Sequence, residues 1–191
     1  MAITPLWENG DKMSYYRSGN YVVEISYDEC AENPREWGQD ETDWHLVCAE
    51  HRHYNLPHET HDTLSSKEMS ENPDYEVRPL SFFDHSGVAL VEGVHDGWDV
   101  CFCGYAWRKR GGYDVELSDV LDVWNTWANG GVMTATLYDL DGNILDSIGG
   151  LYEDSERDAL AFLIHHGYFD APGFDPDNAT EIQPHYTISF H

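Results

Sequence analysis

Histidines and cysteines gather in one stretch of the sequence, and these are the residue types that could hold a zinc ion. The stretch runs from 45 to 61 and contains His45, Cys48, His51, His53, His58 and His61. Structural zinc sites are closed by four sulfur or nitrogen ligands. We expect residues 42–54 to form a helix, which would place Cys48 and His51 on one face, with Cys101 or Cys103 completing the set. Because a single Cys-x-x-His pair is common by chance, a buried cysteine beside a core histidine is the simpler interpretation.

A second group of reactive residue types lies at 84–87, where the sequence reads Asp-His-Ser-Gly. Adjacent side chains diverge, so these residues cannot form the orienter, base and nucleophile of a triad. A turn with Gly87 at positive φ is the better interpretation, and His85 as a general acid or metal ligand is the weaker alternative. The sequence has no phosphate-binding glycine loop, no His-Glu-x-x-His pair and no Gly-x-Ser-x-Gly elbow. We therefore expect a binding protein and not an enzyme.

Acidic residues greatly outnumber basic residues in the chain. It has 36 Asp and Glu against 10 Lys and Arg, a formal net charge of −26 over 191 residues. Duplex DNA carries one charge per ~1.7 Å of axis, so this excess corresponds to roughly 44 Å of duplex. Direct nucleic-acid binding is disfavoured, because the one dense basic cluster, 108–110, resembles a turn at a strand end. Adaptation to high salt, general solubility or divalent-cation sites would also account for the acidity.

Two groups of acids stand out as candidate partner-binding surfaces. In the helix expected at 116–128, three acids recur every third residue and form a solvent-facing stripe. A second group surrounds the start of the helix expected at 154–166, where the helix dipole favours negative charge. The residues concerned are Glu116, Asp119 and Asp122 in the first group, and Glu153, Asp154, Glu156 and Asp158 in the second.

The periodicity of apolar residues predicts an α+β fold, a mainly antiparallel sheet with two or three helices packed on one face. Asp141-Gly142 between two apolar runs is a strong hairpin signal. Besides the two helices named above, the expected elements are strands at 20–27, 80–83, 88–92 and 98–107, hairpin strands at 131–138 and 143–148, and an edge strand at 185–190. We expect a single domain over 1–191, with a mobile loop at 57–76 and a less structured tail at 171–184.

The remaining bulk features favour a soluble, intracellular protein. No stretch approaches the ~18 to 20 apolar residues of a membrane span, and the first seven residues lack a signal-peptide pattern. A chain of this length does not need disulfides, so we expect the four cysteines to be reduced thiols.

Several segments in this order resemble a widespread family of uncharacterised bacteriophage proteins. They are Asn-Pro-Arg-Glu-Trp at 33–37, Cys-x-x-His-Arg-x-Tyr-Asn-Leu at 48–56, Asp-His-Ser-Gly at 84–87 and Leu-Asp-Ser with its following Gly-x-Tyr-x-Asp at 145–154. The likeness covers 27–154, and it departs from the pattern at His53, where the family usually has Arg. The resemblance implies a phage product acting in the host cytoplasm, and it carries no activity, ligand or catalytic residue.

These observations lead to three hypotheses. The first is a phage accessory protein that acts by binding, a strongly acidic and DNA-mimicking inhibitor or modulator of a basic host protein that handles nucleic acid or defends the host. The second is a small zinc-binding domain or enzyme that uses Cys48, His51, Cys101, Cys103 and His85. The third is a homo-oligomeric structural or regulatory phage protein whose acidity serves solubility, with seven Trp and twelve Tyr available for an interface.

Overall fold

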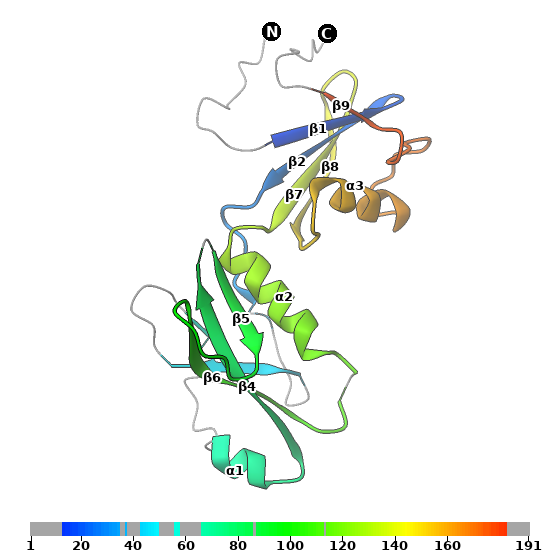
Figure 1. The fold of residues 1–191 in the computed structure, drawn as a ribbon. Coiled ribbons are helices and arrows are strands. Elements are labelled where there is room, and N and C mark those ends of the chain that lie inside the picture. Colours follow the sequence, from blue (N-terminus) through cyan, green and yellow to red (C-terminus); the bar gives the residue numbers. More distant parts are fainter. Residues whose placement is uncertain are drawn as a thin grey trace. The chain divides into compact units, whose positions relative to one another are not determined.

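The chain divides into two compact units, each with its own hydrophobic core. The computed structural model describes residues 13–34, 37, 43–49, 56–57, 66–85, 87–112 and 114–182. Backbone contacts group 1–32 with 130–191, here called the terminal unit, and separate them from 33–129, here called the middle unit (Figure 1). We expected a single domain from the sequence, whereas the buried apolar residues fall into two clusters that follow these two units.

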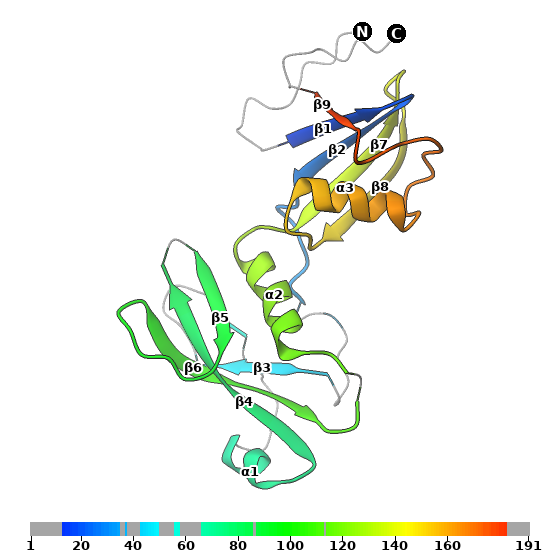
Figure 2. The same cartoon turned by 45° about the vertical axis from the view of Figure 1, so that its right-hand side comes forward.

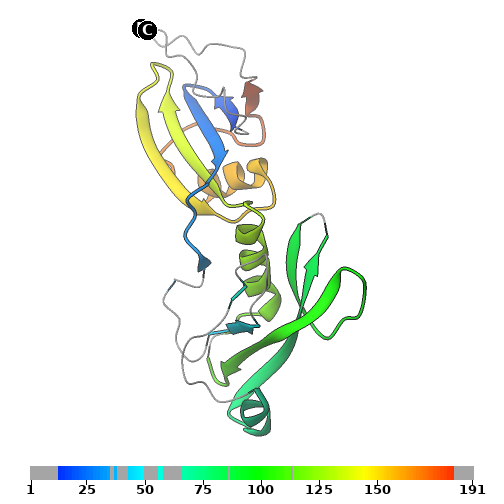
Figure 3. The same ribbon diagram turned by 90° about the vertical axis from the view of Figure 1, so that its left-hand side faces the viewer.

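The terminal unit contains a five-stranded antiparallel sheet with one helix on one face. The order of its strands is β8-β7-β2-β1-β9. Figure 3 shows α3, Glu156–His165, on the inner side of the curved sheet. The strands are β1 at Met13–Ser18, β2 at Tyr21–Tyr27, β7 at Met133–Asp139, β8 at Ile144–Leu151 and β9 at Thr180–Ile182.

Alternation along the strands explains this arrangement. Every second residue of β2 and β7 faces α3, and Val23, Ile25 and Leu137 are almost fully buried against Leu160 and Leu163. The predicted strand at 20–27, the Asp-Gly hairpin and the helix at 154–166 are confirmed. Gly142 adopts φ 81° in the hairpin turn, and the side chain of Ser155 caps α3 by accepting the backbone N–H of Asp158.

The middle unit is built on a four-stranded antiparallel sheet in the order β3-β6-β4-β5. Its core lies between the sheet and α2, where Leu80, Phe82 and Leu90 meet Leu121 and Trp124. The predicted strands of this region and the helix at 116–128 are confirmed. The elements are β3 at His45–Cys48, α1 at Ser66–Glu71, β4 at Tyr75–Asp84, β5 at Val88–Glu92, β6 at Val100–Lys109 and α2 at Leu117–Ala128.

Two asparagines fasten α2 to the free edge of β5. Asn129 Oδ1 accepts the N–H of Val88 at 2.9 Å, and its Nδ2 donates to the carbonyl oxygen of Val88 at 2.7 Å. One turn earlier, Asn125 does the same for Leu90, at 2.7 and 3.1 Å. The two amides therefore take the place of a neighbouring strand, and α2 runs beside β5 in Figure 2. Edge strands left open in this way invite pairing with other chains, and here the edge is closed internally.

The predicted fold class is wrong. The described residues are mostly β and form two separate antiparallel sheets, not one sheet with two or three helices on one face. Which strands pair depends on contacts between residues far apart in the chain, and local periodicity does not contain that information. The strands that were predicted correctly therefore belong to two sheets and not to one.

Two local expectations also differ from the structure. Residues 45–48, expected within a helix at 42–54, form β3. Leu46 and Cys48 of the strand, and Trp44 just before it, are buried in alternation. The expected loop at 57–76 contains α1 and the first residues of β4. In the expected tail at 171–184 lies β9, paired with β1, while the strand expected at 185–190 lies outside the described residues.

Candidate binding surfaces

The residues suggested as zinc ligands are only partly brought together. Cys48 on β3 and Cys103 on β6 are both buried, and their sulfur atoms lie 3.8 Å apart. Cys101 and His85 are exposed, and His51 lies outside the described residues. Within the described ranges, no three His, Cys, Asp or Glu side chains gather as a metal site would require. The helical spacing behind the zinc hypothesis is also lost, because Cys48 lies on a strand.

The two acidic groups lie in different units. Glu116 precedes α2, while Asp119 and Asp122 lie on its exposed side, so the stripe in the middle unit is present as expected. In the terminal unit the second group surrounds the start of α3. The chain therefore has an acidic surface on each unit.

Glu156 differs from the other acids in its group. Its Oε2 accepts the hydroxyl of Ser14 at 2.5 Å and that of Tyr16 at 3.3 Å, and the side chain is half-buried. Asp158 takes part in the cap of α3 with Ser155. Glu156 therefore ties α3 to β1, which makes it a structural residue and a poor candidate for partner binding, whereas Asp154 is exposed.

The acidic excess is shared by both units. The terminal unit holds 17 Asp and Glu against 3 Lys and Arg, an excess of 14, and the middle unit holds 19 against 7, an excess of 12. At ~1.7 Å of duplex axis per charge, these values correspond to roughly 24 and 20 Å of DNA.

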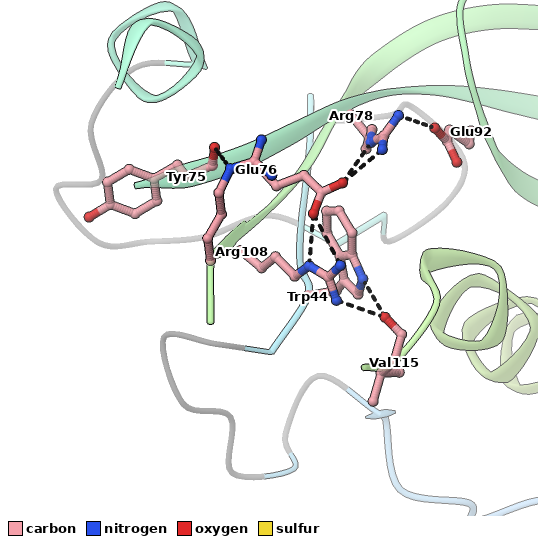
Figure 4. A network of polar contacts seen from close by, with 8 residues as sticks. Trp44, Tyr75, Glu76, Arg78, Glu92, Arg108 and Val115 are labelled. Carbon is pink, nitrogen blue, oxygen red and sulfur yellow. Dashed lines mark hydrogen bonds and ion pairs between the residues drawn. The ribbon is translucent and has the colours of Figure 1, made fainter. Parts of the chain in front are cut away.

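In the described part of the middle unit, Arg78 and Arg108 are both paired with one carboxylate. Glu76, on β4, accepts from Arg78 at 2.7 Å and from Arg108 at 3.1 Å, and Figure 4 shows its carboxylate between the two guanidinium groups. Arg78 also pairs with Glu92 at 3.4 Å. The guanidinium of Arg108 lies 4.4 Å from the ring centroid of Trp44. The hydrogen bond from Arg78 is the largest cause that lowers the pKa of Glu76.

The basic run at 108–110 is the densest of the sequence, and two of its side chains donate hydrogen bonds to backbone carbonyl oxygens. Arg108 donates to the carbonyl oxygen of Val115 at 2.9 Å, and Arg110 to that of Tyr75 at 3.1 Å. Cations that could neutralise surface acids or track a phosphate backbone are thus used to hold β4, β6 and the approach to α2 together.

The loop between β5 and β6, at 93–99, displays apolar side chains to solvent. Trp98 is 104% exposed and Val94 is 68% exposed, and on the neighbouring strand β6 Phe102 is 58% exposed. Large apolar side chains gathered at a surface commonly mark an interface. The strand expected at 98–107 included Trp98, whereas β6 begins at Val100 and Trp98 lies in the exposed loop, so the sequence did not reveal this surface.

The sheet face of the terminal unit opposite α3 carries a tyrosine pair around one acid. Tyr15, Glu24 and Thr136 are cross-strand neighbours on β1, β2 and β7. The hydroxyl of Tyr138 donates to Glu24 Oε2 at 3.3 Å. Burial, followed by the charge of Glu24, raises the pKa of Tyr138 to about 12 and also raises that of Tyr15. This face is therefore polar and aromatic, with its acid held by hydroxyl donors.

Comparisons with known proteins found no matching family model, no matching curated protein and no matching solved structure. None of the helices in the described ranges is both long enough and apolar enough to span a bilayer. The resemblance of the motifs at 33–37, 48–56, 84–87 and 145–154 to bacteriophage proteins stays a prediction from the sequence.

Proposed function

We propose that this protein is a phage accessory protein that acts by binding, presenting its acidic surface to a basic host protein that handles nucleic acid. The observation that carries the proposal is the combination of a large acidic excess with two arginines, Arg78 and Arg108, that are already paired with an acid of the same fold. The acids on α2 and at the start of α3 include exposed carboxylates, while Arg78 and Arg108 are held by Glu76. A surface of this kind attracts and orients basic partners.

A nucleic-acid-binding protein is the favoured class of partner, because its binding surface is selected to meet closely spaced negative charges. The acidic excess of each unit equals the charge on roughly 24 or 20 Å of duplex, as derived above. One helical turn of duplex is about 34–36 Å long, so each unit matches roughly two thirds of a turn. An acidic protein that occupies such a surface would compete with DNA. The motifs that resemble phage proteins suggest the host cytoplasm as the place where this occurs.

The proposal is tested by a pulldown of tagged protein from bacterial lysate at low and high salt, with bound proteins identified by mass spectrometry. We expect a basic nucleic-acid-binding protein that is retained at about 50 mM salt and released at about 500 mM, because screening weakens charge complementarity. A variant with Asp119→Asn and Asp122→Asn keeps the fold and removes two exposed charges, and it should retain less partner. Retention that does not change with salt, or bound proteins that are not basic, would contradict the proposal.

A further inference from the structure

The 93–99 loop is held firmly against one face of the middle sheet. Ser81, which is fully buried, donates its hydroxyl to the carbonyl oxygen of Gly93 at 2.8 Å and accepts the N–H of His95 at 3.1 Å. The N–H of Gly93 donates to the carbonyl oxygen of Pro79 at 2.8 Å, and Gly93 has a φ of 111°, which favours glycine. At the other end of the loop, the N–H of Asp84 donates to the carbonyl oxygen of Asp99 at 3.0 Å. The loop is thus fixed at both ends by β4.

Phe102, an exposed apolar residue of β6, belongs to this same face. Phe102 is the cross-strand partner of Ser81, so both side chains lie on the side of the sheet that the loop covers. Phe83, two residues after Ser81, lies on that side as well, and its ring centroid is 6.0 Å from that of His95. The opposite face packs on α2 through Leu80 and Phe82. We call the three exposed apolar residues, Val94, Trp98 and Phe102, the Trp98 patch.

Two exposed acids, Asp96 and Asp99, lie in the same loop as Val94 and Trp98. Between 79 and 107 the chain has no Lys or Arg, and its two other acids, Asp84 and Glu92, are cross-strand partners of Val88 and Leu80 on the face that packs on α2, where Glu92 pairs with Arg78. All four are exposed. Asp99 Oδ2 lies 3.3 Å from His85 Nδ1, an ion pair when the imidazole is protonated. Exposed apolar side chains beside two acids favour a partner that brings apolar and basic side chains together.

We propose that the Trp98 patch binds a basic segment of a partner protein in which Arg or Lys side chains alternate with apolar ones. The apolar side chains would cover Val94 and Phe102. A guanidinium would stack on the indole of Trp98, the ring that binds cations best, while Asp96 and Asp99 receive the neighbouring charges. Tryptophan is also among the residues that contribute most to binding at interfaces. This inference rests on the proposed function and adds to it the place and the chemistry of the contact.

The test uses the full chain and a fluorescein-labelled peptide of ten residues in which Arg and Leu alternate, with binding measured by fluorescence anisotropy. We expect Trp98→Ala to weaken binding about ten-fold or more, as loss of a central interface tryptophan does. Trp37→Ala is the control, because Trp37 is another surface tryptophan of the middle unit, 41% exposed, and lies outside the 93–99 loop. It should change the affinity less than about two-fold. A peptide with Ser in place of Leu should bind the wild-type protein more weakly.

The contribution of the two loop acids is tested by a second pair of variants that remove equal charge. Asp96→Asn with Asp99→Asn should weaken binding several-fold more than Asp119→Asn with Asp122→Asn, which lie on α2. Unchanged thermal unfolding would show that Trp98→Ala leaves the fold intact, as expected for a fully exposed side chain.

The outcomes separate this inference from the function on which it rests. Suppose that Trp98→Ala and Trp37→Ala have equal effects and that both charge variants weaken binding alike. The peptide then binds acidic residues all over the surface, so the Trp98 patch is not its binding site, while the proposed function stands. Absence of peptide binding at low salt also overturns the patch. The opposite outcome is also possible to recognise. If Trp98→Ala weakens binding of the Arg–Leu peptide but the pulldown captures no basic host protein, the proposed function is overturned and the binding chemistry of the Trp98 patch stands.

Discussion

The asparagine connection between α2 and β5 should contribute several kcal/mol to the stability of the middle unit. Replacing Asn125 by Ala removes two hydrogen bonds, one to the N–H and one to the carbonyl oxygen of Leu90. Leu90 is 1% exposed, so water cannot readily replace the amide. Each buried backbone group left without a partner costs about 1–3 kcal/mol. Alanine returns roughly 0.5 kcal/mol through its better helix propensity, so we expect a net loss of about 1.5–5.5 kcal/mol.

The location of the tryptophans makes this loss measurable. Six of the seven tryptophans belong to the middle unit, so urea unfolding followed by tryptophan fluorescence reports on that unit. With a urea m-value of about 1.5–2 kcal/mol/M, the midpoint should fall by roughly 1–4 M. Asp122→Ala is the matched control, because Asp122 is exposed on the same helix, and it should change stability by less than about 0.5 kcal/mol.

Hydrogen exchange provides a second readout at the residue concerned. In the wild-type protein the amide of Leu90 should exchange slowly, and in Asn125→Ala its exchange should accelerate more than that of Leu46 on β3, at the far edge of the same sheet. A loss of stability below about 0.5 kcal/mol, together with unchanged protection of Leu90, would refute the idea that the amide acts as a substitute strand.

Three further predictions follow from individual contacts. Gly104→Ala should destabilise the middle unit, measured by urea unfolding, because a Cβ there would overlap the carbonyl oxygen of Val47 and lie 2.8 Å from Cys48 Cα; Gly149→Ala, whose added Cβ would meet its nearest atom at 3.5 Å, should be tolerated. Ser155→Ala should cost the terminal unit about 1 kcal/mol in thermal unfolding, since the cap of α3 is lost, and no loss would contradict the capping role. Because the pKa of Tyr138 is raised to about 12 in the fold, the unfolded chain releases this proton first, so the stability of the terminal unit should fall as pH rises from about 10 to about 12. Tyr138→Phe should reduce that fall in far-ultraviolet circular dichroism, and an unchanged pH profile would show that Tyr138 does not contribute.

Local signals in the sequence predicted much of the secondary structure. The Asp141-Gly142 turn, the Ser155 cap and the apolar face of α2 each involve neighbours within a few residues, so the sequence alone shows them. The stretch containing β3 was ambiguous, because its apolar residues fit a helical face at i, i+3 and i+4 as well as strand alternation. Packing decided the outcome: Trp44, Leu46 and Cys48 are buried on one side.

The binding surfaces were less predictable, because they depend on which residues the fold uses internally. The acidic stripe on α2 could be recognised from spacing alone. The sequence does not reveal that Glu156 bonds to Ser14 and Tyr16, since these contacts join residues more than 100 positions apart. The engagement of Arg108 by Glu76 and the exposure of Trp98 likewise follow from strand pairing and loop attachment, which periodicity does not specify.

The measurement that tests the central claim most directly is competition with DNA for the captured partner. Labelled duplex DNA bound to the purified host protein is titrated with this protein at several salt concentrations. We predict that it displaces the duplex, that its affinity for the partner falls steeply with salt, and that Asp119→Asn with Asp122→Asn weakens the displacement. Simultaneous binding of the duplex and this protein, or an affinity that does not change with salt, would contradict the account.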